Sequence, residues 1–258
     1  MTLPAGLWGV PTSTVDWCEA NYQYTPLVAE LWNTLSSLSM VAAGALGVWL
    51  HRRVLSRRFV AAFLLLALVG LGSVAFHATL RFELQLLDEL PMLYLVALMV
   101  YILMEDRPTT RFGPLFPAGL IAYAALLTWL CAGSRGRLQF WVFQVSFGSL
   151  ELFSLVRVYL VHRRTTDGAL RRLFKWGLLC YGLGVSLWFI DIRFCEVVSV
   201  LLPRHGIPNP QLHAFWHLLV SCGFYALLLV IGADRLRTLG RTPSLRFVGG
   251  LIPRLEAT

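Results

Sequence analysis

Long apolar stretches alternate with short polar and charged segments along almost the whole chain. Each stretch has close to the 20 residues that an α-helix needs to cross ~30 Å of hydrocarbon. The pattern predicts an all-α membrane protein, a bundle of seven transmembrane helices with a short structured head at residues 1–30 and a basic tail at residues 233–258. The expected helices cover residues 31–50, 59–79, 88–104, 114–132, 138–160, 175–192 and 212–232.

Composition agrees with this pattern. Of the 258 residues, 57% are hydrophobic and 14% are charged, whereas soluble domains carry about 25% charged residues. The first 30 residues contain no lysine or arginine, so we expect no signal peptide, which would begin with a basic segment. The tail is expected to be partly disordered or to lie on the membrane surface.

The net charge of +8 is distributed unevenly between the two ends of the predicted helices. Seventeen of the lysine and arginine residues fall at the end that includes the tail, and five fall at the other end. The positive-inside rule then predicts a cytosolic C-terminus and a lumenal or external N-terminus. Because topology explains the basic excess, we expect no binding to nucleic acid.

Three histidines fall at helix ends that this topology places on the non-cytosolic side. His213 and His217 are four residues apart and share a helix face, and His77 ends the second predicted helix. Three imidazoles with an open position are typical of catalytic zinc. The alternative is chance, because a pair of histidines at this spacing occurs on many helices and often only forms hydrogen bonds. His51, His162 and His205 lie in basic segments, where a solvated role suffices.

Two further residues are candidates for catalysis. Asp88, expected to open the third helix, would either orient a ligand histidine or move a proton at the metal site. Its neighbour Glu89 competes for this role, and periodicity does not decide between them. Ser73 lies four residues before His77 and would either stabilise an oxyanion or bond back to a carbonyl of its own helix.

Four ordered blocks resemble the alkaline ceramidases, most closely the branch that acts on phytoceramides and unsaturated long-chain ceramides. The blocks are STVDWCEANYQYTPLVAELWNTLSSL, GLGSVAFHATLRFELQLLDELPMLY, LWFIDIRFCE and QLHAFWHLL. The resemblance implies a zinc-dependent amidase of endoplasmic reticulum or Golgi membranes that hydrolyses ceramide to a sphingoid base and a fatty acid. Zinc would be held by His77, His213 and His217, with Asp88 and Ser73 assisting catalysis in a domain at residues 31–232.

The resemblance also implies a calcium site in the head. Its ligands would be the Trp17 carbonyl and the side chains of Asp16, Glu19, Asn21 and Glu30. Calcium takes 6–8 oxygen ligands, so this set is of a suitable size. The alternative is a simple acidic head exposed to solvent, and the spacing is not that of an EF-hand.

Cysteines and two acids within or at the ends of predicted helices complete the candidates. Cys18 and Cys195 are the cysteines expected on the non-cytosolic side, where an oxidising lumen favours a disulfide between them. Cys131, Cys180 and Cys222 lie within predicted helices as packed small residues. The roles of Glu151 and Asp191 stay open. Asp191 falls at the same end of the predicted bundle as the three histidines, where it would either accept a hydrogen bond from a ligand imidazole or brace the head.

Two other classes of protein compete with the enzyme. A seven-helix lipid receptor of the progestin and adiponectin receptor kind resembles the same superfamily and shares a three-histidine zinc arrangement. A transporter or structural membrane protein would use the histidines only for hydrogen bonds. The DWCE and LLDELPM segments favour the ceramidase, for which no obligate protein partner is expected.

Overall fold

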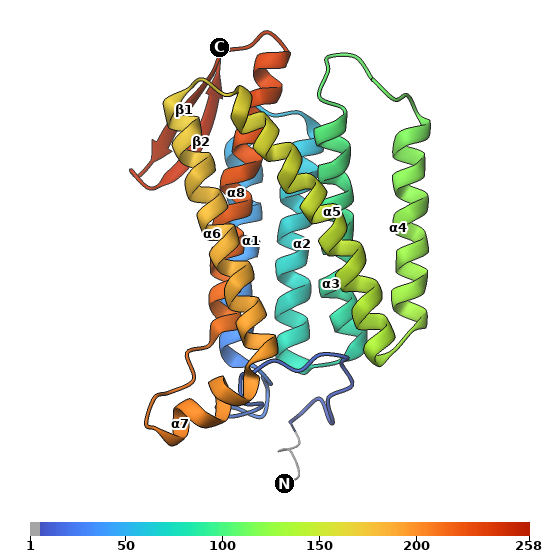
Figure 1. Cartoon of the computed structure of the whole chain (residues 1–258), viewed down its shortest axis with the longest axis vertical. Helices are drawn as coiled ribbons and strands as arrows, with labels where there is room; N and C mark the ends of the chain where they lie inside the picture. The colour runs from blue at the N-terminus through green and yellow to red at the C-terminus, as the bar shows by residue number, and fades with distance from the viewer. Residues whose placement is uncertain (1–5) are drawn as a thin grey trace.

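A computed structural model describes residues 6–258 of the chain as a bundle of long helices (Figure 1). Seven of the helices in this range are long and apolar enough to cross a membrane. They are α1 (Leu31–His51), α2 (Arg57–Thr79), α3 (Phe82–Met104), α4 (Leu115–Gly133), α5 (Gly136–Arg164), α6 (Gly168–Arg193) and α8 (Leu212–Thr238). The predicted all-α membrane fold is therefore confirmed.

Several helices extend beyond their predicted bounds. Helix α3 was expected to begin at Asp88 but begins at Phe82. Asp88 therefore lies in its second turn and does not open the helix. The polar residue Gln85 hid this start in the sequence, yet it is fully buried against the head, where its Oε1 accepts from Thr14 N–H at 2.7 Å. Helix α6 starts at Gly168 because the Asp167 carboxylate caps it, accepting from two backbone N–H groups.

Close contact between α2 and α3 depends on a glycine. Gly72 packs directly on the backbone of Leu87 and Asp88, and a Cβ atom at this position would collide with the Leu87 carbonyl. The absence of a side chain therefore lets the two helices approach where Ser73 and Asp88 face each other. The core of the bundle lies between α1, α2, α3, α5, α6 and α8, while α4 stands at one edge, with only Leu127 and Cys131 of its residues buried.

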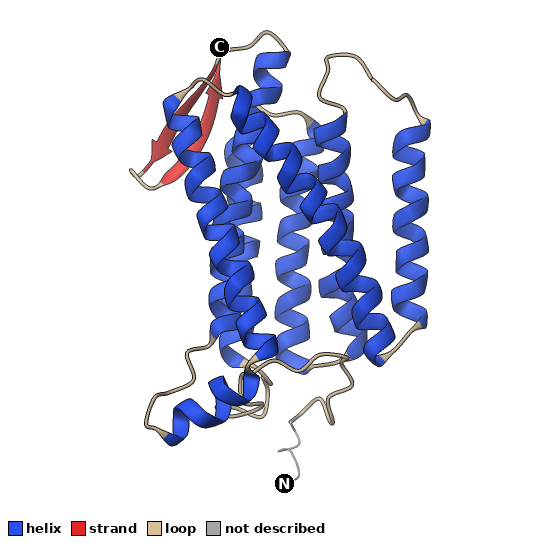
Figure 2. Cartoon of the chain, viewed as in Figure 1, coloured by secondary structure: helices blue, strands red, loops and turns tan. Residues whose placement is uncertain are grey.

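The chain beyond residue 232 is ordered, which corrects the expectation of a partly disordered tail. Helix α8 continues to Thr238, and the strands β1 (Pro243–Val248) and β2 (Ile252–Ala257) form an antiparallel hairpin (Figure 2). Leu255 is fully buried against the bundle, so the hairpin covers apolar surface at the basic end.

Two of the three histidines in basic segments, His51 and His162, are buried, which corrects the expectation that they are solvated. His51 forms the last turn of α1, where its Nε2 accepts from Leu255 N–H at 3.1 Å under the hairpin. His162 lies inside α5 and stacks on Phe174 at 4.0 Å between ring centroids. Helices α1 and α5 both extend beyond the C-terminal ends of their apolar stretches and so include these histidines. His205 is exposed, as expected.

The segment between α6 and α8 contains a short π-helix η1 (Val197–Leu201) and the short α7 (Leu202–Arg204). It lies beside the head at the end of the bundle opposite the hairpin (Figure 1). The head, the loop before α8 and the start of α8 thus meet at one end of the molecule.

Candidate active site

His77, His213 and His217 meet at the end of the bundle that carries the head. His77 lies in the last turn of α2, and the other two lie in the first two turns of α8. All three are buried, and one nitrogen from each ring lies within 4.8 Å of the corresponding atoms of the other two. Among residues 6–258, these three histidines form the one group of at least three potential metal ligands whose donor atoms lie this close together.

Hydrogen bonds to neighbouring side chains orient two of the three rings. His77 Nδ1 contacts Glu30 Oε2 at 2.5 Å, and His217 Nδ1 contacts Ser36 Oγ at 2.8 Å. A carboxylate accepts only from a protonated ring nitrogen, so the Nε2 lone pair of His77 is left for another partner. His213 is held by stacking on Trp17, with ring centroids 3.6 Å apart.

The donor atoms fit a transition metal. His77 Nε2 and His213 Nδ1 are buried and have no hydrogen-bond partner. Orphaned polar atoms in a protein interior are costly, and neutral imidazole nitrogens are common zinc ligands. The contact from Glu30 to His77 matches the carboxylate that usually supports a metal-bound histidine.

The structure separates the roles of Asp88 and Glu89. Glu89 Oε1 accepts from Gln85 Nε2 at 2.8 Å, and Gln139 Nε2 also donates to this carboxylate, so Glu89 belongs to a network joining α3 to α5. Asp88 instead lies beside Ser73, and both line the cavity described below. Ser73 Oγ accepts from Ser37 Oγ at 3.0 Å. Asp88 and Ser73 therefore lie together beside the histidines.

A cavity of about 330 Å³ opens onto this group. Ser73, Asp88, His213 and His217 form part of its wall. The remainder is mainly apolar and includes Phe143, Phe147, Leu152, Val185, Trp188 and Trp216. The cavity thus offers a polar reacting end and a long apolar chamber, the arrangement expected for a lipid chain. Glu151 and Tyr181 also line this cavity.

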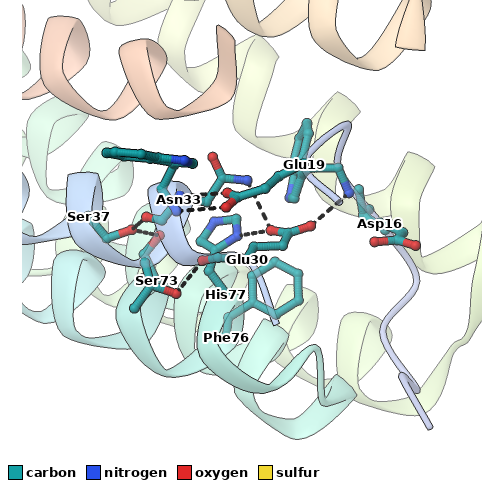
Figure 3. A network of polar contacts seen from close by, with 12 residues as sticks. Asp16, Glu19, Glu30, Asn33, Ser37, Ser73, Phe76 and His77 are labelled. Atoms are coloured by element: carbon teal, nitrogen blue, oxygen red, sulfur yellow. Dashed lines mark hydrogen bonds and ion pairs between the residues drawn. The ribbon is translucent and has the colours of Figure 1, made fainter. Parts of the chain in front are cut away.

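The head attaches to the start of α1 through two buried carboxylates. Both oxygens of Glu19 accept backbone N–H groups of Trp32 and Asn33, at 2.7 and 2.9 Å, and so cap the helix. Glu30 accepts from Trp17 N–H through one oxygen and from Asn33 Nδ2 through the other. Figure 3 shows Glu30 between His77 and the segment that carries Asp16.

These acids repel one another in a poorly solvated place. Burial raises the pKa of Glu19 to about 7 and that of Glu30 to about 8, with a further increase at Glu30 from Asp16. Burial also raises the pKa of Asp16, although Asn21 Nδ2 donates to it at 3.0 Å. Asn21 Oδ1 is buried without a partner. Such oxygen atoms suit a hard cation, but they are spread more widely than the histidine nitrogens.

A disulfide joins the head to the segment after α6. Cys18 and Cys195 are bonded, with Cα atoms 5.3 Å apart. Asp191 Oδ2 accepts from Cys18 N–H at 3.3 Å, and Asn209 Nδ2 donates to the Cys18 carbonyl at 2.7 Å. Asp191 thus braces the head, one of the two roles left open for it. Cys131 and Cys180 are buried as expected, whereas Cys222 is exposed.

Sequence reasoning missed a polar stripe on α1. Asn33, Ser36 and Ser37 contact Glu30, His217 and Ser73 respectively. Ser36 and Ser37 lie three and four residues after Asn33 in a mainly apolar helix, so the three share one face. That spacing was a usable signal, because polar side chains inside a transmembrane helix are seldom without a partner. Gln85 and Gln139 were missed for lack of any local pattern.

Comparison with known proteins identifies the family of the chain. The family model described as Ceramidase matches residues 9–249. Alkaline ceramidase 3 of Mus musculus is 36% identical, over 96% of this chain and 93% of its own length. Alkaline ceramidase of Arabidopsis thaliana is 30% identical over 98% and 95%, and alkaline ceramidase 1 of Homo sapiens is 30% identical over 84% and 81%. On the strength of these matches, the chain belongs to the ceramidase family and is related to the alkaline ceramidases.

Proposed function

We propose that this protein is a zinc-dependent ceramidase that hydrolyses the amide bond of ceramide within the membrane. The observation that carries the proposal is the group of three buried imidazoles at the polar end of an apolar cavity. The names of the relatives supply the substrate class. The cavity suits a lipid with long chains, because such a substrate reaches the polar groups without leaving an apolar environment.

His77, His213 and His217 would hold the zinc ion, and the orphaned nitrogens of His77 and His213 support this assignment. Zinc in a site of this kind supplies Lewis acidity and lowers the pKa of water. Glu30 and Ser36 would keep the His77 and His217 rings in the orientation that ligation requires.

Asp88 and Ser73 would carry out the proton transfer and the charge stabilisation. Water adds to the amide carbon, and Asp88 accepts the proton that the water loses. The same proton then goes to the sphingoid nitrogen as the C–N bond breaks, and the water oxygen remains in the fatty acid. The Ser73 hydroxyl, which lines the cavity beside Asp88, would donate to the developing oxyanion.

Calcium in the head is a second part of the proposal. Asp16, Glu19, Asn21 and Glu30 offer side-chain oxygens, and Trp17 offers its carbonyl. The raised carboxyl pKa values and the unpartnered Asn21 oxygen support a cation there. With the Cys18–Cys195 disulfide, calcium would hold the head against the histidine end.

The central experiment measures zinc content and ceramide hydrolysis on the same purified protein. We expect about one zinc per chain and release of fatty acid. His217→Asn should lose both while its helical content stays unchanged, because one of three ligands is gone. His205→Asn is the matched control, since His205 is an exposed histidine outside the site.

The outcomes separate the competing functions. Turnover by the zinc-free His217→Asn protein would remove zinc from the mechanism. Zinc-loaded protein that leaves a range of ceramides intact would favour a lipid receptor of the progestin and adiponectin kind. Protein without zinc would leave the histidines as hydrogen-bonding groups.

We also propose that the head is lumenal and the tail cytosolic, in endoplasmic reticulum or Golgi membranes. The excess of arginine at the end that carries the hairpin supports this orientation. In sealed microsomes, a protease added outside should remove an epitope placed after Thr258 and spare one placed before the head. The opposite pattern of protection would reverse the topology.

A further inference from the structure

A second cavity lies at the end of the bundle opposite the histidines. It has a volume of about 440 Å³ and is polar. Its walls come from the loop between α3 and α4, from the last turns of α5 and from the end of α8. The lining residues are Asp106, Arg107, Arg111, Arg157, Arg164, Asp234 and Thr238. This cavity shares none of its lining residues with the cavity at the histidines.

Positive charge dominates in and around this cavity. Two more arginines adjoin it, since Arg235 Nη1 donates to the Arg107 carbonyl and Arg58 Nη1 donates to the Glu105 carbonyl. Four arginines and two carboxylates line the cavity, and with the adjoining Arg58, Arg235 and Glu105 the region holds six arginines and three carboxylates. Several positive groups in one concave place attract anions strongly.

The carboxylates neutralise this charge only in part. Arg157 lies 3.8 Å from Asp106, and Arg164 lies 3.6 Å from Asp234, both beyond hydrogen-bond distance. The Glu105 carboxylate is already occupied by the backbone N–H groups of Arg111 and Phe112. Guanidinium N–H groups therefore remain available in the cavity.

Two arginines that adjoin the cavity without lining it also carry donor atoms without a partner. Arg58 Nη2 and Arg235 Nε have no hydrogen-bond partner, although neither atom is accessible to solvent. A buried donor without a partner is costly, and a charged donor more so. Arginine suits phosphate oxygens because its planar group donates two parallel hydrogen bonds.

We propose that this cavity binds a phosphate-bearing anion, held by arginines from the α3–α4 loop, α5 and α8. The anion is either the headgroup of an anionic lipid or a soluble phosphate compound. Basic pockets between transmembrane helices at the membrane surface are suited to lipid headgroups. The bound anion would tie together α5 and α8, which also line the cavity at the histidines.

The test compares two double variants with the same change in charge. Arg111→Gln with Arg164→Gln removes two exposed arginines of the cavity wall. Arg53→Gln with Arg172→Gln removes two exposed arginines at the same end of the bundle but outside the cavity. None of the four belongs to the proposed catalytic or metal-binding groups, so both proteins should fold and keep ceramidase activity.

The first arm uses purified full-length protein in an uncharged detergent. Sodium phosphate should raise the melting temperature saturably above the value in sodium chloride of equal ionic strength. We expect the apparent affinity to fall at least about tenfold in the cavity variant, as the loss of one charge-assisted contact implies, and to be unchanged in the control. Equal effects of chloride and phosphate, or equal affinities of the two variants, would overturn the proposal.

The second arm identifies the source of the phosphate. The protein is placed in nanodiscs of phosphatidylcholine with or without phosphatidic acid, and retained lipid is measured by native mass spectrometry. Retention of phosphatidic acid by wild type and control, but not by the cavity variant, assigns the site to a lipid headgroup. A phosphate-dependent increase in melting temperature in pure phosphatidylcholine, without retained phosphatidic acid in the mixed discs, assigns it to a soluble compound.

Discussion

At the residue scale, Glu30 joins more parts of the site than any neighbour in Figure 3. One oxygen accepts from Trp17 in the head, and the other contacts His77 and accepts from Asn33. The side chain is fully buried. In Glu30→Gln, the amide NH₂ group would replace one of the two accepting oxygens and would face an N–H donor. At least one of the hydrogen bonds would therefore be lost.

Glu30→Gln should therefore lower both stability and metal affinity. Leaving a buried hydrogen-bonding group without its partner costs about 1–3 kcal/mol, and loss of the group that supports a metal ligand weakens binding roughly 10–100-fold. Thermal unfolding and zinc titration against a chelator measure the two effects. Glu83→Gln is the control, because the Glu83 side chain is 70% exposed and lies 4.0 Å from Arg81. Equal results for the two variants would show that Glu30 is only a filler of space.

Asp88 and Glu89 illustrate what neighbouring residues on a helix cannot reveal alone. Both are acids in an apolar segment, and both line the cavity. Only the partners on other helices, Ser73 for Asp88 and Gln139 for Glu89, separate their roles.

At the scale of elements, Glu105 fastens the loop after α3. Its carboxylate accepts from the N–H groups of Arg111 and Phe112, at 2.6 and 2.9 Å. The Arg111 N–H lowers the Glu105 pKa most, and Phe112 N–H and the guanidinium groups of Arg58 and Arg111 lower it further. Because the folded pKa lies below the unfolded value, the contribution to stability is complete above about pH 4.3 and is lost as the pH falls through the folded pKa.

Glu105→Gln should thus be less stable than wild type at neutral pH and should match it in acid. Unfolding temperatures measured across the acidic range test this expectation. Glu256→Gln, on the exposed hairpin, should follow wild type throughout. A difference between Glu105→Gln and wild type that did not change with pH would mean that the carboxylate charge contributes nothing.

The hairpin of β1 and β2 could not be predicted from the sequence, for a different reason. Strands β1 and β2 are short, and the segment at residues 233–258 that contains them carries five arginines, so its composition resembles a solvated tail. They are ordered because Leu255 fills a place in the core and the Leu255 N–H donates to His51. Such a docking surface exists only once the helices have assembled.

At the scale of the whole molecule, the Cys18–Cys195 disulfide connects parts of the chain that are 177 residues apart. Replacing both cysteines by serine should lower stability by about 2–5 kcal/mol, because the unfolded chain regains freedom. Cys222→Ala, at an exposed position outside the disulfide, should change it by less than about 0.5 kcal/mol. Thermal unfolding with and without reductant gives the measurement. A wild-type protein whose unfolding temperature ignores reductant would contradict the role of the disulfide.

The sequence by itself determined the number of long helices and one shared face of α8. Helix length and apolar content are local properties, and the spacing of His213 and His217 puts both rings on one side of a helix whatever surrounds it. The unequal arginine distribution is also readable along the chain and predicts the orientation. The ends of the helices were harder to predict from the sequence, because a polar residue such as Gln85 can continue a helix when another segment of the chain buries it.

Tertiary structure alone decided which side chains meet. His77 reaches His213 and His217 because α2 and α8 lie in one bundle, and Ser73 faces Asp88 because Gly72 allows α2 to approach α3 closely. The polar stripe of α1 gains its partners in the same way. Contacts of this kind depend on packing between distant segments, and the free energy that selects them comes from the whole assembled core rather than from any local pattern.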